Sequence, residues 1–210
     1  MSSAHSSQLP FNQVQPILYA DDGYLSHQVR LVLLEKGIEF QELHIRDDED
    51  NFENLADLNP YNTLPVLLHR ELILYQNGII FEYLEDRYHQ YKLLPETPIE
   101  RANYRQLLWR INHDWLSLVD TLLMHPDTLD VKQASLARKK LSESLVTIAP
   151  LFAHKSYFMS DKMGLCDCVM ACMLWQLPAM QIELPLHLTR PLTDYQQRLF
   201  SRPAFQKSLL

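Results

Sequence analysis

One change in the periodicity of apolar residues constrains the fold of this 210-residue chain more than any other feature. Up to about position 88, short apolar runs of strand length alternate with helical patterns and with turn signals such as Asp21-Asp22-Gly23. Beyond about position 99, only the helical spacing recurs. Its longest example places apolar residues three or four positions apart: Tyr104, Leu108, Ile111, Trp115, Leu118 and Leu122. The sequence therefore predicts an α/β domain followed by an all-α domain.

The α/β part is predicted to follow the order β-α-β-α-β-β-α. Strands are expected over residues 16–20, 40–45, 64–68 and 71–75, and helices over 24–36, 52–58 and 79–88. Gly37 lies where a helix C-cap belongs, and the acidic run over 47–50 is typical of a solvated turn. In the all-α part, helices are expected over 104–122, 136–148, 165–177 and 192–200. The predicted organisation is a disordered leader over 1–14, an N-terminal domain over 15–90, a linker over 91–98 and an all-helical domain over 99–210.

Charge and composition narrow the function. The formal net charge of −7 argues against direct nucleic-acid binding, because neutralising phosphates needs a basic patch. No apolar run reaches the roughly 18 residues of a membrane span, and the Ser-rich N-terminus lacks the features of a signal peptide. Cys166, Cys168 and Cys172 lie in one segment with no second cluster to complete a zinc site. We therefore expect a cytoplasmic protein with buried structural thiols, no metal and no membrane contact.

Three local features resemble the glutathione-transferase family: the Asn59-Pro60 loop before Leu64-Pro65-Val66, the helix start Gly164-Leu165-Cys166-Asp167, and the closing segment Arg202-Pro203-Ala204-Phe205. The resemblance implies a thioredoxin-like N-terminal domain, an all-helical C-terminal domain and a cis bond between Leu64 and Pro65. At the helix start, Asp167 would bind the free backbone N–H groups of the first turn, while Gly164 is a weaker N-cap than Ser.

Within that family, the chain is similar to the bacterial branch that associates with RNA polymerase. The similarity runs from about Ile17 to Phe205 and is densest over residues 24–37. It implies a homodimeric regulator of transcription in stress or starvation that contacts RNA polymerase and its sigma factor through the loop between the domains. At the matching place stand His89, Gln90, Tyr91 and Lys92, where better-known members are rich in Pro and His. The partner-binding residues are therefore predicted at these four positions.

The resemblance also bears on catalysis. The residue that would hold glutathione's sulfur as a thiolate falls at Gly23, which has no side chain to do so. Tyr19, Tyr24 and Ser26 lie close to that position in sequence, but Tyr19 belongs to the strand pattern and Ser26 is displaced by three residues. We therefore predict no catalytic residue.

A vestigial ligand site remains a prediction. The family's carboxylate-binding dipeptide at the start of the third helix reads Gln76-Asn77 here, and the other ligand-binding candidates are Tyr24, Leu64 and Pro65. Weak glutathione binding stays open, with no other cofactor expected. The main alternative function is a glutathione transferase of low or unusual activity, and a free-standing structural or chaperone-like dimer is a third.

Overall fold

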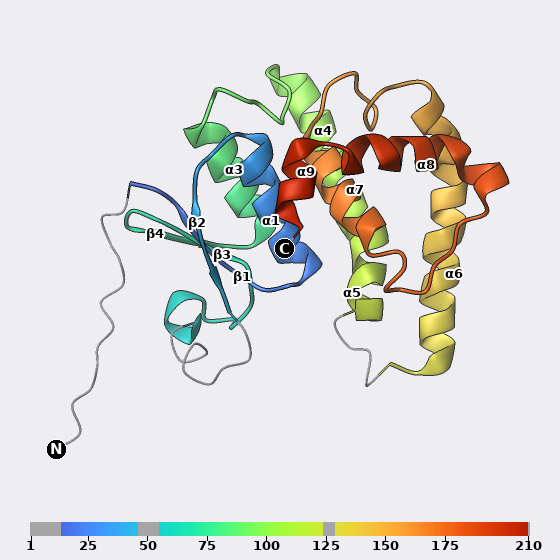
Figure 1. Cartoon of the computed structure of the whole chain (residues 1–210), viewed down its shortest axis with the longest axis horizontal. Helices are drawn as coiled ribbons and strands as arrows, with labels where there is room; N and C mark the ends of the chain where they lie inside the picture. Colours follow the sequence, from blue (N-terminus) through green and yellow to red (C-terminus); the bar gives the residue numbers. More distant parts are fainter. Residues whose placement is uncertain (1–13, 46–54, 124–128, 210) are drawn as a thin grey trace. The chain divides into compact units, whose positions relative to one another are not determined.

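The computed structural model describes residues 14–45, 55–123 and 129–209 (Figure 1). The chain divides into two compact units, Met1–Arg87 (unit 1) and Tyr88–Leu210 (unit 2). Residues 1–13 of the predicted leader and the acidic run over 47–50 lie outside the described residues. Of the helix expected over 52–58, the described part, 55–58, is helical.

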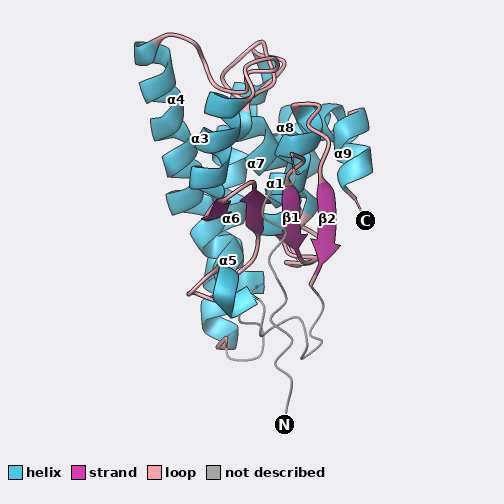
Figure 2. Ribbon diagram, turned by 90° about the vertical axis from the view of Figure 1, so that its left-hand side faces the viewer, coloured by secondary structure: helices cyan, strands magenta, loops and turns pink. Residues whose placement is uncertain are grey.

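Unit 1 is built on a four-stranded mixed sheet with the order β2-β1-β3-β4. Its strands are β1 (Ile17–Ala20), β2 (Gln41–His44), β3 (Val66–His69) and β4 (Leu72–Tyr75). Strand β1 runs parallel to β2, as Figure 2 shows, and antiparallel to β3, which pairs antiparallel with β4. The central strands β1 and β3 are almost wholly buried, whereas the edge strands β2 and β4 are more exposed.

Two helices of unit 1, α1 (Tyr24–Glu35) and α3 (Asn77–Arg87), pack side by side (Figure 1). Helix α1 ends as predicted, because Gly37 adopts a positive φ of 64° that its missing side chain permits. Lys36, directly after α1, and Glu85 of α3 form a buried ion pair with Nζ and Oε1 2.6 Å apart. The Leu64–Pro65 bond is cis, which confirms that prediction.

In unit 2 the described residues contain helices and no regular strand. The helices are α4 (Pro98–Arg110), a π-helix (Ile111–Leu116), α5 (Ser117–Leu123), α6 (Val131–Ile148), a 3₁₀ turn (Ala149–Ala153), α7 (Leu165–Trp175), α8 (Leu186–Phe200) and α9 (Pro203–Ser208). With the mixed sheet of unit 1, this arrangement confirms the predicted fold class, a thioredoxin-like domain followed by an all-helical one.

The single helix predicted over 104–122 is interrupted by the π-helical segment. A π-helical turn accommodates extra residues, which rotates everything beyond it relative to an ideal α-helix. Beyond this segment Val119 is fully buried and Leu118, one of the apolar positions named from the sequence, is half-buried.

Helix α7 forms the centre of unit 2, since every residue from Leu165 to Leu174 is buried. The three cysteines lie on this helix as free, buried thiols, as expected. Asp167 at the third helical position accepts hydrogen bonds from the backbone N–H of Gly164 at 2.9 Å and of Phe158 at 2.7 Å. Tyr195 of α8 donates its hydroxyl proton to the same carboxylate. Asp167 thus acts in folding, as its place at the helix start predicted.

Candidate functional site

The loop that leads into α1 is closed by the carboxylate of Asp21. Its Oδ1 accepts hydrogen bonds from the backbone N–H of Gly23 at 2.9 Å and from the hydroxyl of Ser26 at 2.5 Å. The Ser26 hydroxyl in turn accepts one from the backbone N–H of Asp21 at 3.1 Å. Two donors beside the position predicted to lack a catalytic group, the Gly23 N–H and the Ser26 hydroxyl, are therefore bound to a carboxylate of the same loop.

The two tyrosines beside this loop are poor candidates for holding a thiolate. Tyr24 is 3 % exposed. Tyr19 is half-buried and packs against the small apolar cluster of Leu55, Leu58 and Val66. Burial raises the pKa of Tyr19, so its hydroxyl stays protonated at neutral pH. Its packing in this cluster, and not its ionisation, argues against a role in holding a thiolate.

Strand pairing brings the predicted ligand residues of β3 and β4 together. Val66 pairs with Tyr75 in the antiparallel ladder, so the neighbouring Pro65 and Gln76 lie opposite each other at the same end of the sheet. Gln76 is exposed and has a positive φ of 74°, which is uncommon for a residue other than Gly and occurs frequently at ligand sites. Its carbonyl oxygen accepts the N–H groups of Ile79 and Ile80 and so begins α3.

The side chain of Asn77 connects the start of α3 to α1. Its Nδ2 donates to the carbonyl oxygen of Leu25 and to Oε1 of Gln28, each at 2.9 Å. Gln28 is 1 % exposed, and its Nε2 has no hydrogen-bond partner among the described residues. Asn77 therefore connects the start of α3, directly after Gln76, to α1 at Leu25 and Gln28.

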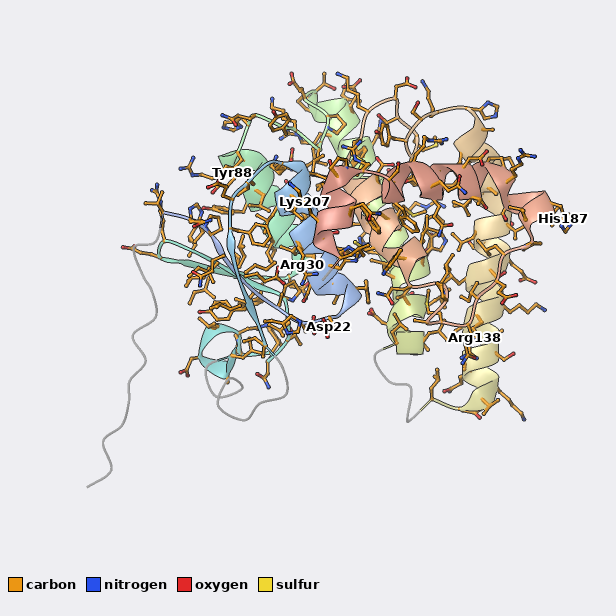
Figure 3. All side chains as sticks on the ribbon, viewed as in Figure 1. Asp22, Arg30, Tyr88, Arg138, His187 and Lys207 are labelled. Carbon is orange, nitrogen blue, oxygen red and sulfur yellow. The ribbon has the colours of Figure 1, made fainter. Side chains whose placement is uncertain are left out.

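This arrangement offers polar groups to a small ligand but no activated group to a sulfur atom. Sequence reasoning missed both Asp21, which occupies the donors of the α1 loop, and Gln28, which carries a buried unpaired amide. Neither belongs to a local motif: their relevance comes from contacts with Ser26 and Asn77 that only the folded chain makes. Arg30, one turn further along α1, is bound by the carboxylate of Glu42 (Figure 3 labels Arg30 and Asp22).

The second predicted site is the segment that precedes α4. Its first four residues are exposed, and the residues that follow them are buried. His89, Gln90, Tyr91 and Lys92 are exposed, with Tyr91 at 62 %. The next two residues, Leu93 and Leu94, are buried at 6 % and 3 %.

Several hydrogen bonds hold this segment in one conformation. The carbonyl oxygen of Leu93 accepts the backbone N–H of Leu165, the first residue of α7, at 3.0 Å. The carbonyl oxygen of Pro95 accepts Nε of Arg101 at 3.0 Å. Thr97 caps α4 by accepting the N–H of Glu100. The tip is thus presented on an ordered support.

Within the described ranges, no group of three or more His, Cys, Asp or Glu side chains is arranged to hold a metal ion. The helices described there are all too short or too polar to cross a bilayer.

The comparisons with known proteins agree with the fold. The glutathione S-transferase N-terminal domain model matches residues 17–86, and the C-terminal domain model matches residues 115–203. A solved structure described as a ternary complex of BphK, a bacterial GST, superposes with a TM-score of 0.81 at 22 % identity, covering 92 % of this chain and 97 % of that one. The chain belongs to the glutathione S-transferase family.

Within the family, sequence similarity points to one branch. The chain is 38 % identical to the stringent starvation protein A homolog of Coxiella burnetii over 184 residues, which cover 88 % of this chain and 86 % of the relative. It is 35 % identical to the stringent starvation protein A homolog of Haemophilus influenzae over 209 residues, which cover 100 % of this chain and 94 % of the relative. Its relatives at this level of identity thus bear the name stringent starvation protein A, which agrees with the predicted branch.

Proposed function

We propose that this protein is a cytoplasmic regulator of transcription in the stress or starvation response, which acts by binding RNA polymerase and its sigma factor and not by catalysing a transferase reaction. The relatives named for stringent starvation support the physiological context. The main support for this mode of action is that residues 89–92 display an exposed aromatic side chain and a cation on an ordered support.

The ordered support of residues 89–92 lowers the entropy cost of binding a partner. A partner that binds a mobile loop must offset the entropy lost when the loop becomes ordered, whereas a fixed loop avoids most of that penalty. Buried Leu93 and Leu94 and the Leu93–Leu165 hydrogen bond hold the tip before any partner arrives. Tyr91 then offers a large contact area, since aromatic side chains are favoured in interface centres. Lys92 lies beside Glu96 with Nζ and Oε1 3.1 Å apart, an exposed pair that adds charge specificity.

The same proposal excludes efficient transferase chemistry. Gly23 supplies no hydroxyl or thiol, and two donors beside it, its own backbone N–H and the Ser26 hydroxyl, are bound to Asp21. A carboxylate at this place also disfavours a nearby thiolate by like-charge repulsion. An enzyme of this kind gains its rate by stabilising the thiolate, so the loop around Gly23 lacks the main source of acceleration.

We further propose that the protein acts as a homodimer. In unit 2, α4 has no buried residue, and Ile99 and Trp109 on it are 77 % and 60 % exposed. In unit 1, Tyr61 is 72 % exposed and Ile79 is 55 % exposed. Apolar side chains exposed in a single chain to this extent are well suited to burial against a second copy. Light scattering is expected to give twice the 24.7 kDa of one chain, and a mass near 24.7 kDa at micromolar concentration would contradict the dimer.

The test of the main function is binding of purified RNA polymerase holoenzyme to the full chain, measured by interferometry. A double variant, Tyr91→Ala with Lys92→Glu, is expected to weaken binding by about tenfold or more, because an aromatic anchor and a charge are lost together. The matched control is Val131→Ala with Lys132→Glu, which changes an exposed apolar residue and an adjacent lysine elsewhere in unit 2. Equal affinity of the correctly folded double variant and the control would refute the role of the segment, and absence of binding by the unmodified chain would refute the function.

A second candidate, glutathione binding with little or no turnover, is favoured by the strained φ of the exposed Gln76 and by its position beside cis-Pro65. The γ-glutamyl carboxylate would meet the N-terminal end of α3, where backbone N–H groups favour an anion. Calorimetric titration with glutathione tests it, with Gln76→Ala as the variant. Heat of binding that Gln76→Ala leaves unchanged would rule out this site.

A further inference from the structure

Met159 stands at the tip of a tight hairpin between α6 and α7, the tan segment in Figure 1. Tyr157 and Ser160 form an isolated antiparallel bridge around it, with N–H to carbonyl distances of 3.0 and 3.3 Å. Met159 has a positive φ of 56° and is 61 % exposed. Positive φ is uncommon for an unbranched apolar residue, and Asn or Gly would adopt it more easily. An apolar side chain is therefore displayed to solvent at a position whose backbone favours a different residue.

The hairpin is rigidly attached to the core of unit 2. Phe158, beside the tip, is 4 % exposed and stacks on Phe152 with ring centroids 5.3 Å apart. Its backbone N–H donates to Asp167 at 2.7 Å. On the other side, Arg202 donates to the hydroxyl of Tyr157 at 2.8 Å. The strain at Met159 is maintained by these contacts, as is common where strain serves a binding role.

Several cations belong to the hairpin or bind it. Lys155 pairs with Asp161 across the base of the hairpin at 2.5 Å, and Lys162 follows it. Arg198 donates to the carbonyl oxygen of Ser156 at 3.2 Å, and Arg202 lies against Tyr157. Lys155, Lys162, Arg198 and Arg202 thus supply four positive charges. The exposed carboxylates near them are Asp161 and Glu96, while Asp167, which Arg202 also influences, is buried.

The two units of the chain differ in net charge, and the hairpin belongs to the positively charged unit. Unit 1 has 5 Lys and Arg against 15 Asp and Glu, a net of −10, whereas unit 2 has 14 against 11, a net of +3. An exposed apolar residue on a hairpin with an excess of cations is complementary to an apolar pocket whose rim carries carboxylates. A chain of net charge −7 disfavours nucleic acid as the occupant.

We propose that the Met159 hairpin, residues 155–162 with Arg198 and Arg202, is a second docking surface, which inserts Met159 into an apolar, acid-rimmed pocket of a protein partner. The flexible thioether adapts to the shape of the pocket, while the fixed hairpin limits the entropy lost on binding. Lys162 of the hairpin lies near Glu96, the ion-pair partner of Lys92, so this surface adjoins residues 89–92. Its role does not depend on polymerase being the partner.

The test is photo-crosslinking in cells that express the full chain with a diazirine amino acid at position 159. The control carries the same amino acid at Leu186, an apolar residue of similar exposure, 62 %, on α8. Crosslinked peptides are sequenced by mass spectrometry. We expect position 159, and not 186, to capture one protein segment that combines apolar residues with an excess of Asp and Glu. Equal capture at both positions, capture of nucleic acid, or no protein crosslink at 159 would overturn the proposal.

Further variants separate docking from folding. Lys155→Glu with Arg198→Glu is expected to lower the yield at position 159 about tenfold, while the control, Lys139→Glu with Lys140→Glu on α6, leaves it unchanged. With the captured partner in purified form, Met159→Leu should bind within about twofold of the unmodified chain, whereas Met159→Asn should bind about tenfold more weakly or worse. Asn tolerates positive φ, so thermal unfolding of Met159→Asn should show no loss of stability. Undiminished binding of this variant would refute the role of the methionine.

Discussion

The hydroxyl oxygen of Tyr104 occupies the space that a side chain on Gly164 would fill. A Cβ built on Gly164 would overlap that oxygen and come within 3.0 Å of the carbonyl oxygen of Leu93. From this position Tyr104 accepts the backbone N–H of Cys166, in the first turn of α7, at 2.9 Å. A tyrosine from α4 thus supplies the N-terminal cap that an adjacent Ser or Thr side chain usually supplies. The glycine at this helix start is therefore a requirement of packing and not a weaker version of the usual cap.

The first prediction is a compensating pair at the start of α7. Gly164→Ser is expected to destabilise the protein by about 1–3 kcal/mol through overpacking, and Tyr104→Leu by roughly 1–3 kcal/mol because a buried N–H loses its acceptor. The double variant should lose less than the sum of the two, because the introduced serine side chain would then have room to cap the helix. Urea unfolding measures all three.

Gly78→Ala is the control for this pair. Gly78 lies in the first turn of α3, and a Cβ added there meets no atom within 4 Å. We expect it to be neutral or slightly stabilising, because Ala favours the helix. Strictly additive effects of the Gly164 and Tyr104 changes would contradict the capping role.

The second prediction concerns the ion pair of Lys36 and Glu85, whose side chains are 0 % and 2 % exposed. Lys36→Met alone should destabilise unit 1 by about 3–5 kcal/mol, because it leaves a carboxylate buried without its cation. Adding Glu85→Leu should recover most of that loss or exceed the original stability. Denaturant unfolding gives the values, and Lys139→Met, which removes one member of an exposed pair, should change little. A double variant as unstable as Lys36→Met would disprove the desolvation argument.

The third prediction is a pH dependence at His27, which is 5 % exposed. Burial first, and the nearby Arg30 second, lower the pKa of His27 to about 4 from 6.5. The unfolded chain therefore binds the proton at a higher pH than the native state. The stabilisation from neutral His27 is complete above pH 6.5 and is lost as the pH falls toward 4, by up to about 3 kcal/mol.

The measurement is the difference in unfolding free energy between the unmodified chain and His27→Gln at about pH 7 and about pH 4.5, on either side of the ordinary histidine pKa. On acidification the unmodified chain should lose more stability than His27→Gln, so its unfolding free energy should fall relative to that of the variant. Using a difference matters, because burial raises the pKa of Asp167 to about 6, and that group contributes a pH dependence of the opposite sign in both proteins. A difference that stays constant with pH would show that His27 titrates normally.

The fourth prediction is that the protein has no glutathione transferase activity. The purified chain should not accelerate conjugation of glutathione to a general electrophile, because a thiol at its ordinary pKa of about 8.5 is only a few per cent ionised at neutral pH. Gly23→Ser should remain inactive, since the new Cβ would lie 2.9 Å from Oδ1 of Asp21 and the hydroxyl would meet a carboxylate that is already bound. A family member of known activity serves as the positive control. Turnover that Tyr19→Phe or Tyr24→Phe abolishes would reverse this conclusion.

Much of unit 1 could be predicted from sequence because its signals are local. Turn residues and short apolar runs delimit each strand, and Gly37 marks the end of α1. Unit 2 was harder to predict for two physical reasons. The first is that the π-helical segment does not follow the 3.6-residue period. The second is that Pro191 lies inside α8: this helix begins at Leu186, whereas the sequence suggested a start near residue 192. Helix α9, over Pro203–Ser208, appeared in the sequence only as a closing segment.

The candidate site was predictable only in part. Positions 76 and 77 and the tip at 89–92 could be found because they occupy recognisable places between elements. The roles of Asp21, Gln28 and Tyr104 could not, because each depends on a partner whose position the fold determines. Gln28 meets Asn77 across 49 residues of sequence, and Tyr104 meets Cys166 across 62.

In the segment before α4, one set of residues packs against unit 2 and another set is exposed to solvent. Leu93, Leu94 and Pro95 hold the segment to unit 2, whereas positions 89–92 face solvent. The four exposed positions can therefore be exchanged as a cassette without disturbing the scaffold that carries them. Chimaeras that transplant this tetrapeptide between relatives should keep their thermal stability, and under the proposed function they should exchange binding preference.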